Sequence, residues 1–163
     1  MYVTVRFGVL VTWASPVMRM LGQSEVSLGR YGGVDIASAV TEFHKAFGLP
    51  MRNIPSGEVD CDLAKLRVAL LEEEVSEFVT ASEKGDIVGI ADALADITYV
   101  VYGTALTYGI DLDAVLQEVH RSNMSKLDGD GRPLIRDDGK VLKSDRYFPP
   151  DIEAVLSRQA RKT

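Results

Sequence analysis

Two long segments without proline, joined by a link of three residues, constrain this sequence more than any other feature. The first, residues 59–83, contains neither glycine nor proline, and the second is residues 86–108. Apolar residues recur in both at the three- and four-residue spacing of one helix face. Because the Lys84-Gly85-Asp86 link is short, the two segments are predicted to form an antiparallel helical hairpin.

Helices are also predicted on both sides of this hairpin. Asp35 can cap a helix that runs to about residue 47, where Gly48-Leu49-Pro50 ends it. Asp111 can cap a fourth helix that reaches residues 124–127. The helix of residues 86–108 carries one stripe of small residues and one of bulky apolar residues, so it is expected to be covered on both sides and to be central. The sequence therefore predicts an all-α fold, an antiparallel bundle of about four helices.

The remaining segments lie outside this bundle. Residues 1–33 show no sustained periodicity and end in a glycine-rich stretch, so they are interpreted as an N-terminal extension. The helical domain is predicted to span residues 34–127. Residues 128–163 are expected to form a small hairpin around Asp137-Asp138-Gly139 and then a short helix that opens at Pro149-Pro150-Asp151.

Charge and cysteine content exclude several classes of function. With 163 residues and a net charge of −6, the chain has the size of one domain and no basic surplus for a nucleic-acid backbone. The single cysteine, Cys61, cannot form an internal disulfide, which favours the cytoplasm. The apolar stretch of residues 90–110 carries two aspartates, which a bilayer would disfavour. We therefore expect a cytoplasmic protein whose partners are neither nucleic acid nor membrane.

The glutamates of the first hairpin helix do not follow the usual division between apolar and solvated faces. At 100° per residue, Glu74 and Glu77 lie on the apolar face and Glu73 lies at its edge. Glu72 points the opposite way, toward solvent. Burying a carboxylate without a partner is costly, so an apolar face interrupted by acids predicts either cationic side chains or a bound metal ion.

Asp92 and Asp96 lie one turn apart on the second hairpin helix. Glu77 and Asp92 are eight and seven residues from Gly85, whereas Glu74 and Asp96 are each eleven residues away. The hairpin therefore brings two levels of acid together, and such charges repel unless a divalent cation lies between them. An all-oxygen ligand set favours Mg²⁺, with Mn²⁺ as a substitute, over zinc or copper.

These carboxylates resemble the metal motif of the MazG-like, all-α nucleoside triphosphate pyrophosphohydrolases. Glu73-Glu74-x-x-Glu77 matches the first motif of that family, and Asp96 matches the final aspartate of its second motif, Glu-x-x-Asp. Ala93 stands where the family usually has a glutamate. Either Asp92 supplies the missing carboxylate or the site holds fewer metal ions. The resemblance covers residues 35–127.

The resemblance implies hydrolysis of a nucleoside triphosphate between the α and β phosphates, which yields a monophosphate and pyrophosphate. Glu74, Glu77, Asp92 and Asp96 would hold the metal, and Glu73 would position or deprotonate the attacking water. The expected role is nucleotide pool cleaning. Phosphoribosyl-ATP pyrophosphohydrolase activity and a dUTPase-like activity remain alternatives within the same chemistry.

Several other polar residues are candidates for binding the substrate. Asn123 is predicted on the inward face of the fourth helix with Lys126 one turn on, and relatives use similar positions to bind phosphate. Tyr99, Phe43 and His44 are possible base contacts, although aromatic residues at helical spacing are more often part of a core. Arg67 could contact the substrate or pair with an acid.

A second class of function stays open, namely a non-enzymatic helical module whose acids bind a structural cation or pair with Arg67 and Lys126. A redox di-metal bundle is disfavoured, because neither His44 nor His120 completes a Glu-x-x-His motif. Apolar surface on more than one side of the hairpin predicts self-association as a homodimer or homotetramer.

Overall fold

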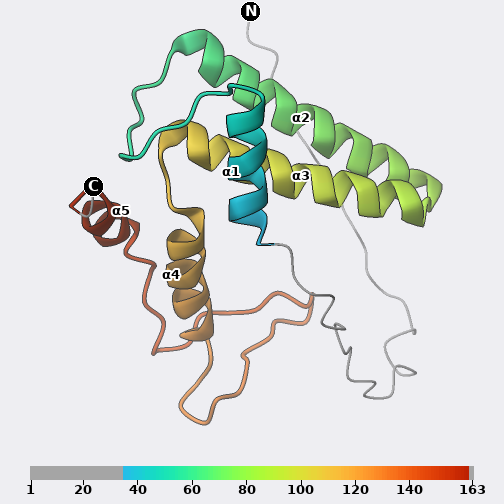
Figure 1. Cartoon of the computed structure of the whole chain (residues 1–163). Coiled ribbons are helices and arrows are strands. Elements are labelled where there is room, and N and C mark those ends of the chain that lie inside the picture. The colour runs from blue at the N-terminus through green and yellow to red at the C-terminus, as the bar shows by residue number, and fades with distance from the viewer. Residues whose placement is uncertain (1–34, 162–163) are drawn as a thin grey trace, which may run out of the picture.

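The computed structural model describes residues 35–161, which form five α-helices joined by loops (Figure 1). In chain order the helices are α1 (Ile36–Ala46), α2 (Cys61–Lys84), α3 (Ile87–Tyr108), α4 (Leu112–Met124) and α5 (Ile152–Ala160). Within this part of the chain the only β pairing is an isolated antiparallel bridge between Ile135 and Val141. The prediction of an all-α fold is confirmed, and the predicted extension of residues 1–33 lies outside the described residues.

An aspartate caps the N-terminus of each helix in residues 35–161. In each case the carboxylate accepts a hydrogen bond from a backbone N–H of the first turn, which otherwise has no partner inside the helix. The capping residues are Asp35, Asp60, Asp86, Asp111 and Asp151. The predicted start of the second helix was slightly wrong, because the Asp60 side chain binds the N–H groups of Asp62 and Leu63 and so fixes the start of α2 at Cys61.

The turn between α2 and α3 is closed by glycine at two positions. Gly85 has φ +65°, a left-handed conformation that glycine adopts with little cost, and its N–H reaches the carbonyls of Ala81 and Ser82. One turn into α3, a Cβ placed on Gly89 would lie 3.1 Å from the Cβ of Ala81. Both glycines allow the two helices to pack closely from the turn onward.

Helix α3 is the central element, as predicted. It packs along α2 and is crossed by α1 (Figure 1). The buried apolar residues on this side are mostly small, and Ala93 keeps only 2% of its surface exposed. Coverage on both sides is not achieved within one chain, since Leu94 of the bulky stripe remains 48% exposed.

By length and composition, α3 is apolar enough to cross a membrane, the one such helix found in residues 35–161. The core helix of a soluble protein passes the same test. Asp92 and Asp96 lie within α3, and α3 contacts both α1 and α2.

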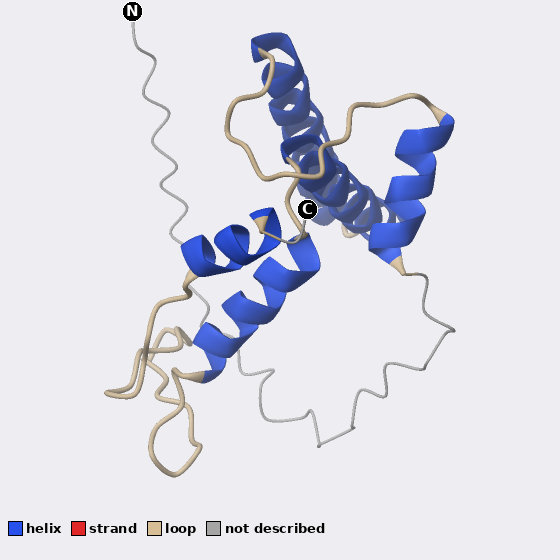
Figure 2. Ribbon diagram, turned by 60° about the vertical axis from the view of Figure 1, so that its left-hand side comes forward, coloured by secondary structure: helices blue, strands red, loops and turns tan. Residues whose placement is uncertain are grey.

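Helix α4 packs against α5 rather than along the α2–α3 hairpin (Figure 2). The single chain thus consists of a three-helix unit, α1 to α3, followed by a pair formed by α4 and α5. The predicted small hairpin lies between α4 and α5 along the chain, where Ile135 and Val141 form an antiparallel bridge. Next to this bridge, the Arg136 N–H donates to the Lys140 carbonyl and the Leu142 N–H donates to the Leu134 carbonyl.

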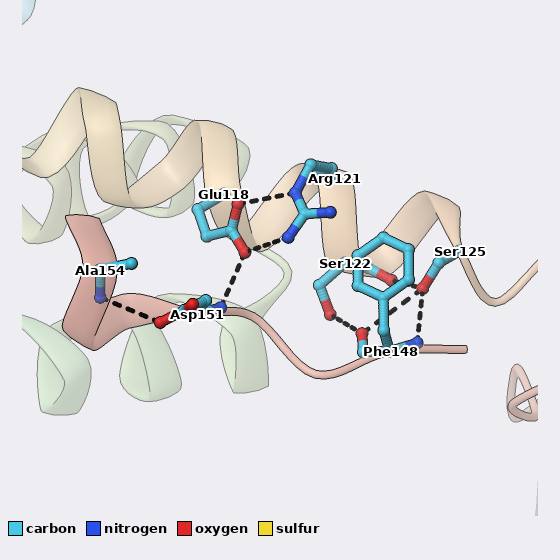
Figure 3. Close-up of polar contacts among 7 residues, drawn as sticks. All are labelled: Glu118, Arg121, Ser122, Ser125, Phe148, Asp151 and Ala154. Carbon is cyan, nitrogen blue, oxygen red and sulfur yellow. Dashed lines mark hydrogen bonds and ion pairs between the residues drawn. The ribbon is translucent and has the colours of Figure 1, made fainter. Parts of the chain in front are cut away.

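Polar contacts hold the segment before α5 against α4 (Figure 3). The Ser122 hydroxyl donates to the Phe148 carbonyl at 2.8 Å, and the Phe148 N–H donates to the Ser125 hydroxyl at 3.1 Å. The Glu118 carboxylate accepts from Arg121 and from the Asp151 N–H, and these bonds lower its pKa to about 2.

This arrangement corrects the predicted inward face of α4. Ser122 is buried, whereas Asn123 is exposed and Leu116 keeps 47% of its surface in solvent. The helix turns a different face inward because its partner is α5 and the preceding segment, and not the α2–α3 hairpin.

Candidate metal and nucleotide site

Glu74 is the one acid of the α2–α3 hairpin, among the described residues, that is not exposed. It is half-buried on the face of α2 that packs against α3, between the buried residues Arg67 and Ala81 of the same helix. Its pKa is raised first by burial and then by the negative charges of Asp96, Glu77, Glu73 and Asp92. All five predicted metal or catalytic carboxylates therefore share one electrostatic environment.

The two predicted levels of acid are present across the hairpin. Asp96 is the charged group that raises the pKa of Glu74 most, which agrees with their equal distance from Gly85 along the chain. Glu77 and Asp92 line opposite sides of the same surface groove between α2 and α3. The short turn thus produced the register expected from the sequence.

No cationic side chain of residues 35–161 neutralises this cluster. The ion pairs in that part of the chain are Lys65–Asp62, Arg121–Glu118 and Arg136–Asp138. Arg67 and Lys126, the two cations expected to pair with the acids in a structural role, make other contacts. The negative charge of the cluster is therefore available for a cation from solution.

The donor set suits a hard divalent cation. All five residues offer carboxylate oxygens, which Mg²⁺ and Mn²⁺ prefer. Four of them (Glu73, Glu77, Asp92 and Asp96) are exposed. As they stand, no three His, Cys, Asp or Glu side chains of the described residues converge closely enough to hold an ion. The exposed side chains make no hydrogen bonds in the described structure that would prevent them from turning toward Glu74.

Position 93, where the family motif has a glutamate, is buried in this structure. The Ala93 side chain is buried, whereas the neighbouring Asp92 is exposed beside Glu77. A glutamate at position 93 would have to displace packed side chains. Asp92 is therefore the carboxylate on this part of α3 that can reach the level of Glu77.

Arg67 and His44 are both buried beside Gly103, where α1, α2 and α3 meet. Arg67 donates through Nε to the Thr104 hydroxyl at 3.1 Å and through Nη2 to the Val100 carbonyl at 2.8 Å. A Cβ on Gly103 would lie 2.8 Å from both Arg67 Nη2 and His44 Nε2. Only glycine at position 103 leaves room for these two side chains.

The residues predicted as possible base or phosphate contacts lie in one region of the fold. The ring of Phe43 packs edge-on against that of Tyr99, with 5.6 Å between the ring centroids. The centroid of the His44 ring lies 6.5 Å from that of Phe43. Burial lowers the pKa values of both His44 and Arg67. The hydrogen bonds of Arg67 go to α3 rather than to an acid, so its contacts in this structure tie α2 to α3.

Asn123 and Lys126 lie at the end of α4, away from the elements that carry the acids. The Lys126 ammonium donates to the Asn123 side-chain oxygen at 2.8 Å. Because α4 packs against α5 and not along α2 or α3, a single chain does not bring this pair to the carboxylates. Its predicted role in phosphate binding would require a second copy of the chain.

Sequence reasoning overlooked three polar residues beside the acids. Ser76, Thr80 and Lys84 line the groove that contains Glu77 and Asp92. Their spacing of four residues places them on one face of α2 and was readable from the sequence. These residues did not stand out in the sequence, because this face of α2 is exposed to solvent and polar residues are common on exposed faces.

Comparison with known proteins supports one family. The model of the phosphoribosyl-ATP pyrophosphohydrolase family matches residues 40–123, just over half of the 163 residues. An uncharacterized protein of Acanthamoeba polyphaga mimivirus is 35% identical over 109 residues, which are 65% of this chain and 41% of that protein. A candidate NTP pyrophosphohydrolase from Exiguobacterium sp. 255-15 is 26% identical, with a TM-score of 0.46 and coverage of 79% of this chain and 98% of the other.

Proposed function

Because the chain belongs to the phosphoribosyl-ATP pyrophosphohydrolase family, a family of hydrolases that act on pyrophosphate bonds, we propose that it hydrolyses a nucleotide between its α and β phosphates. The substrate would be a nucleoside triphosphate or a related nucleotide, and the products a monophosphate and pyrophosphate. The observation that carries this proposal is the group of five carboxylates around Glu74, which no protein cation of residues 35–161 neutralises.

Glu74, Glu77, Asp92 and Asp96 would hold Mg²⁺, for which Mn²⁺ could substitute. When bound, the cation supplies charge neutralisation at the phosphate oxygens and activation of water. Glu73 is exposed next to Glu74 and forms no ion pair within residues 35–161, so its carboxylate can accept the proton of the attacking water. The reaction needs no covalent nucleophile, and the proton leaves the site through this exposed side chain.

The base would lie toward α1. Phe43 and Tyr99 present aromatic surface about one turn of α3 beyond Asp96, and His44 lies beside them. Aromatic rings stack on every nucleobase, so this contact would bind the substrate without selecting one base strongly. Such tolerance fits the removal of unwanted nucleotides from the cytoplasmic pool.

Self-association is the second part of the proposal. Large apolar side chains remain about half-exposed along the hairpin, among them Leu66, Val68, Val75, Val79 and Leu94. A second copy that covered this surface would form a homodimer or homotetramer. The same association could bring Asn123 and Lys126 of one copy to the carboxylates of another and so add phosphate contacts.

Two alternatives are distinguished by substrate. The family description favours phosphoribosyl-ATP, and a dUTPase-like preference would use the same carboxylates with a different base pocket. A non-enzymatic module is less consistent with the structure, because Arg67 and Lys126 bind Thr104, Val100 and Asn123 instead of the acids.

One experiment tests the activity and names the substrate. The full chain is incubated with Mg²⁺ and a panel that contains the common nucleoside triphosphates, dUTP, modified nucleotides and phosphoribosyl-ATP, and the products are separated. Monophosphate with pyrophosphate supports the proposal, and the fastest substrate decides between pool cleaning and biosynthesis. Orthophosphate as the primary product, or no turnover of any nucleotide, would overturn it.

A further inference from the structure

The groove between α2 and α3 continues past the carboxylates toward the hairpin turn. It encloses about 260 Å³ and is lined by residues of both helices. Glu77 and Asp92 lie at its end near the candidate metal site, and Lys84 lies at the other end, in the last turn of α2. The groove therefore extends from the carboxylates to the ammonium group of Lys84.

The distance suits an elongated anion. Glu77 and Lys84 are seven residues apart on one helix, which is about 10 Å along its axis. The flexible four-carbon stem of lysine lets its ammonium cover part of that distance. A group held by a cation at Glu77 and Asp92 would extend along the groove toward Lys84.

Lys84 is not engaged elsewhere. Its ammonium makes no ion pair or hydrogen bond within residues 35–161. The nearest acid toward the turn, Asp86, uses its carboxylate to accept the N–H groups of Val88 and Gly89 as the cap of α3. Among the hydroxyls of the groove, Thr80 donates to the Ser76 carbonyl, whereas the Ser76 hydroxyl is not bonded to the described residues.

The groove as a whole is acidic, because Glu77, Asp92 and Asp86 outnumber Lys84. A free anion would be repelled, but an anion that arrives with a divalent cation would have its charge balanced at the acidic end. Lys84 would then offer a charge-assisted contact at the other end.

We propose that Lys84 binds the pyrophosphate part of the substrate, and hence the pyrophosphate product, along this groove. The inference rests on the proposed function and adds to it a residue that positions the leaving group. A merely structural Lys84 would interact with the C-terminal dipole of α2 and would contribute to stability alone.

The test is calorimetric titration of the full chain with Mg²⁺–pyrophosphate. Lys84→Met should weaken binding about tenfold, the usual size of a charge-assisted hydrogen bond, while Lys84→Arg should retain most of the affinity. Lys65→Met is the matched control, because Lys65 is an exposed lysine of the same helix that pairs with Asp62. It should bind pyrophosphate as the wild type does.

The outcomes separate this inference from the proposed function. Undetectable pyrophosphate binding by the wild type, an unchanged Kd in Lys84→Met, or an equal loss in Lys65→Met would each overturn the role of Lys84, even if the enzyme hydrolyses nucleotides. Absence of turnover by the wild type in the substrate panel overturns the proposed function instead. Thermal melting of each variant verifies that it is folded, since Lys84 is exposed and its replacement should leave the fold intact.

Discussion

Glu74 of α2 and Asp96 of α3 interact across the hairpin: after burial, the negative charge of Asp96 is the largest cause of the raised pKa of Glu74. The two residues are equally distant from Gly85, so the turn sets their register. Neither carboxylate is paired with a cation of residues 35–161. A bound metal ion would relieve their mutual repulsion, so this repulsion favours metal binding.

Replacing a carboxylate that binds the metal by the corresponding amide should lower activity strongly and change the free energy of unfolding little. Glu74→Gln, Glu77→Gln and Asp96→Asn keep the side-chain shape but remove a charged oxygen ligand, so kcat/KM should fall at least about 10- to 100-fold. The measurement is initial rate as a function of Mg²⁺ concentration. Glu72→Gln is the control and should leave the rate unchanged, because Glu72 is exposed on the opposite face. Full turnover by Glu74→Gln would exclude Glu74 from the site.

The stability of the metal-free protein should depend on pH through Glu74. The folded-state pKa of this carboxyl is raised above its ordinary value of 4.5, so the folded state binds its proton more tightly than the unfolded state. Its contribution to stability is present at pH below 4.5 and is lost as the pH rises through the folded-state value. We expect the Tm of wild type relative to Glu74→Gln to fall over that interval in a chelator. Parallel Tm profiles for the two proteins would contradict the raised pKa.

Asp92 should replace the glutamate of the family motif that this chain lacks at position 93. Asp92→Ala is expected to raise the Mg²⁺ concentration needed for half-maximal activity without lowering the metal-free Tm. Adding Ala93→Glu should not rescue activity and should lower the Tm, because Ala93 is 2% exposed and a glutamate there would be buried. Recovery of Mg²⁺ affinity in the double variant would show that position 93 can reach the site after all.

Gly103 should be intolerant of even one methyl group. Gly103→Ala places a Cβ 2.8 Å from Arg67 Nη2 and His44 Nε2, both of which belong to buried side chains. Despite the higher helix propensity of alanine, we expect a net loss of about 1–2 kcal/mol in the free energy of unfolding. Denaturant unfolding measures it. Gly57→Ala, in a loop and with no atom within 4 Å of the new Cβ, is a control for added bulk in open space and should be close to neutral.

Mixing two inactive variants tests whether sites combine residues from two chains. If Lys126 acts in trans, Lys126→Ala and Glu74→Gln should each be slow alone, and a mixture that exchanges subunits should regain activity because one site then has both residues intact. Light scattering gives the oligomeric state of each sample. A mixture no faster than its parents, with exchange verified by mass, would place Lys126 outside the site of the partner.

Most of the local structure could be predicted from the sequence, because its causes are local. Asp35 and Asp111 cap helices as expected, since a side chain reaches the N–H groups of the next turn without help from the rest of the fold. The opposition of Glu74 and Asp96 followed from helical periodicity and from a turn of fixed length. These features depend on residues close together in the chain.

The tertiary structure alone decided which faces are buried and what they meet. Asn123 was predicted to face inward, but α4 packs against α5 and Asn123 is exposed. The bulky apolar stripe of α3 was predicted to be covered, but Leu94 in that stripe remains half-exposed. The burial of Arg67 beside His44 and Gly103 depends on three helices meeting at one point. A periodic pattern specifies that a helix has an apolar face, but the packing partner that covers it is set by the balance of burial over the whole chain, which no local segment contains.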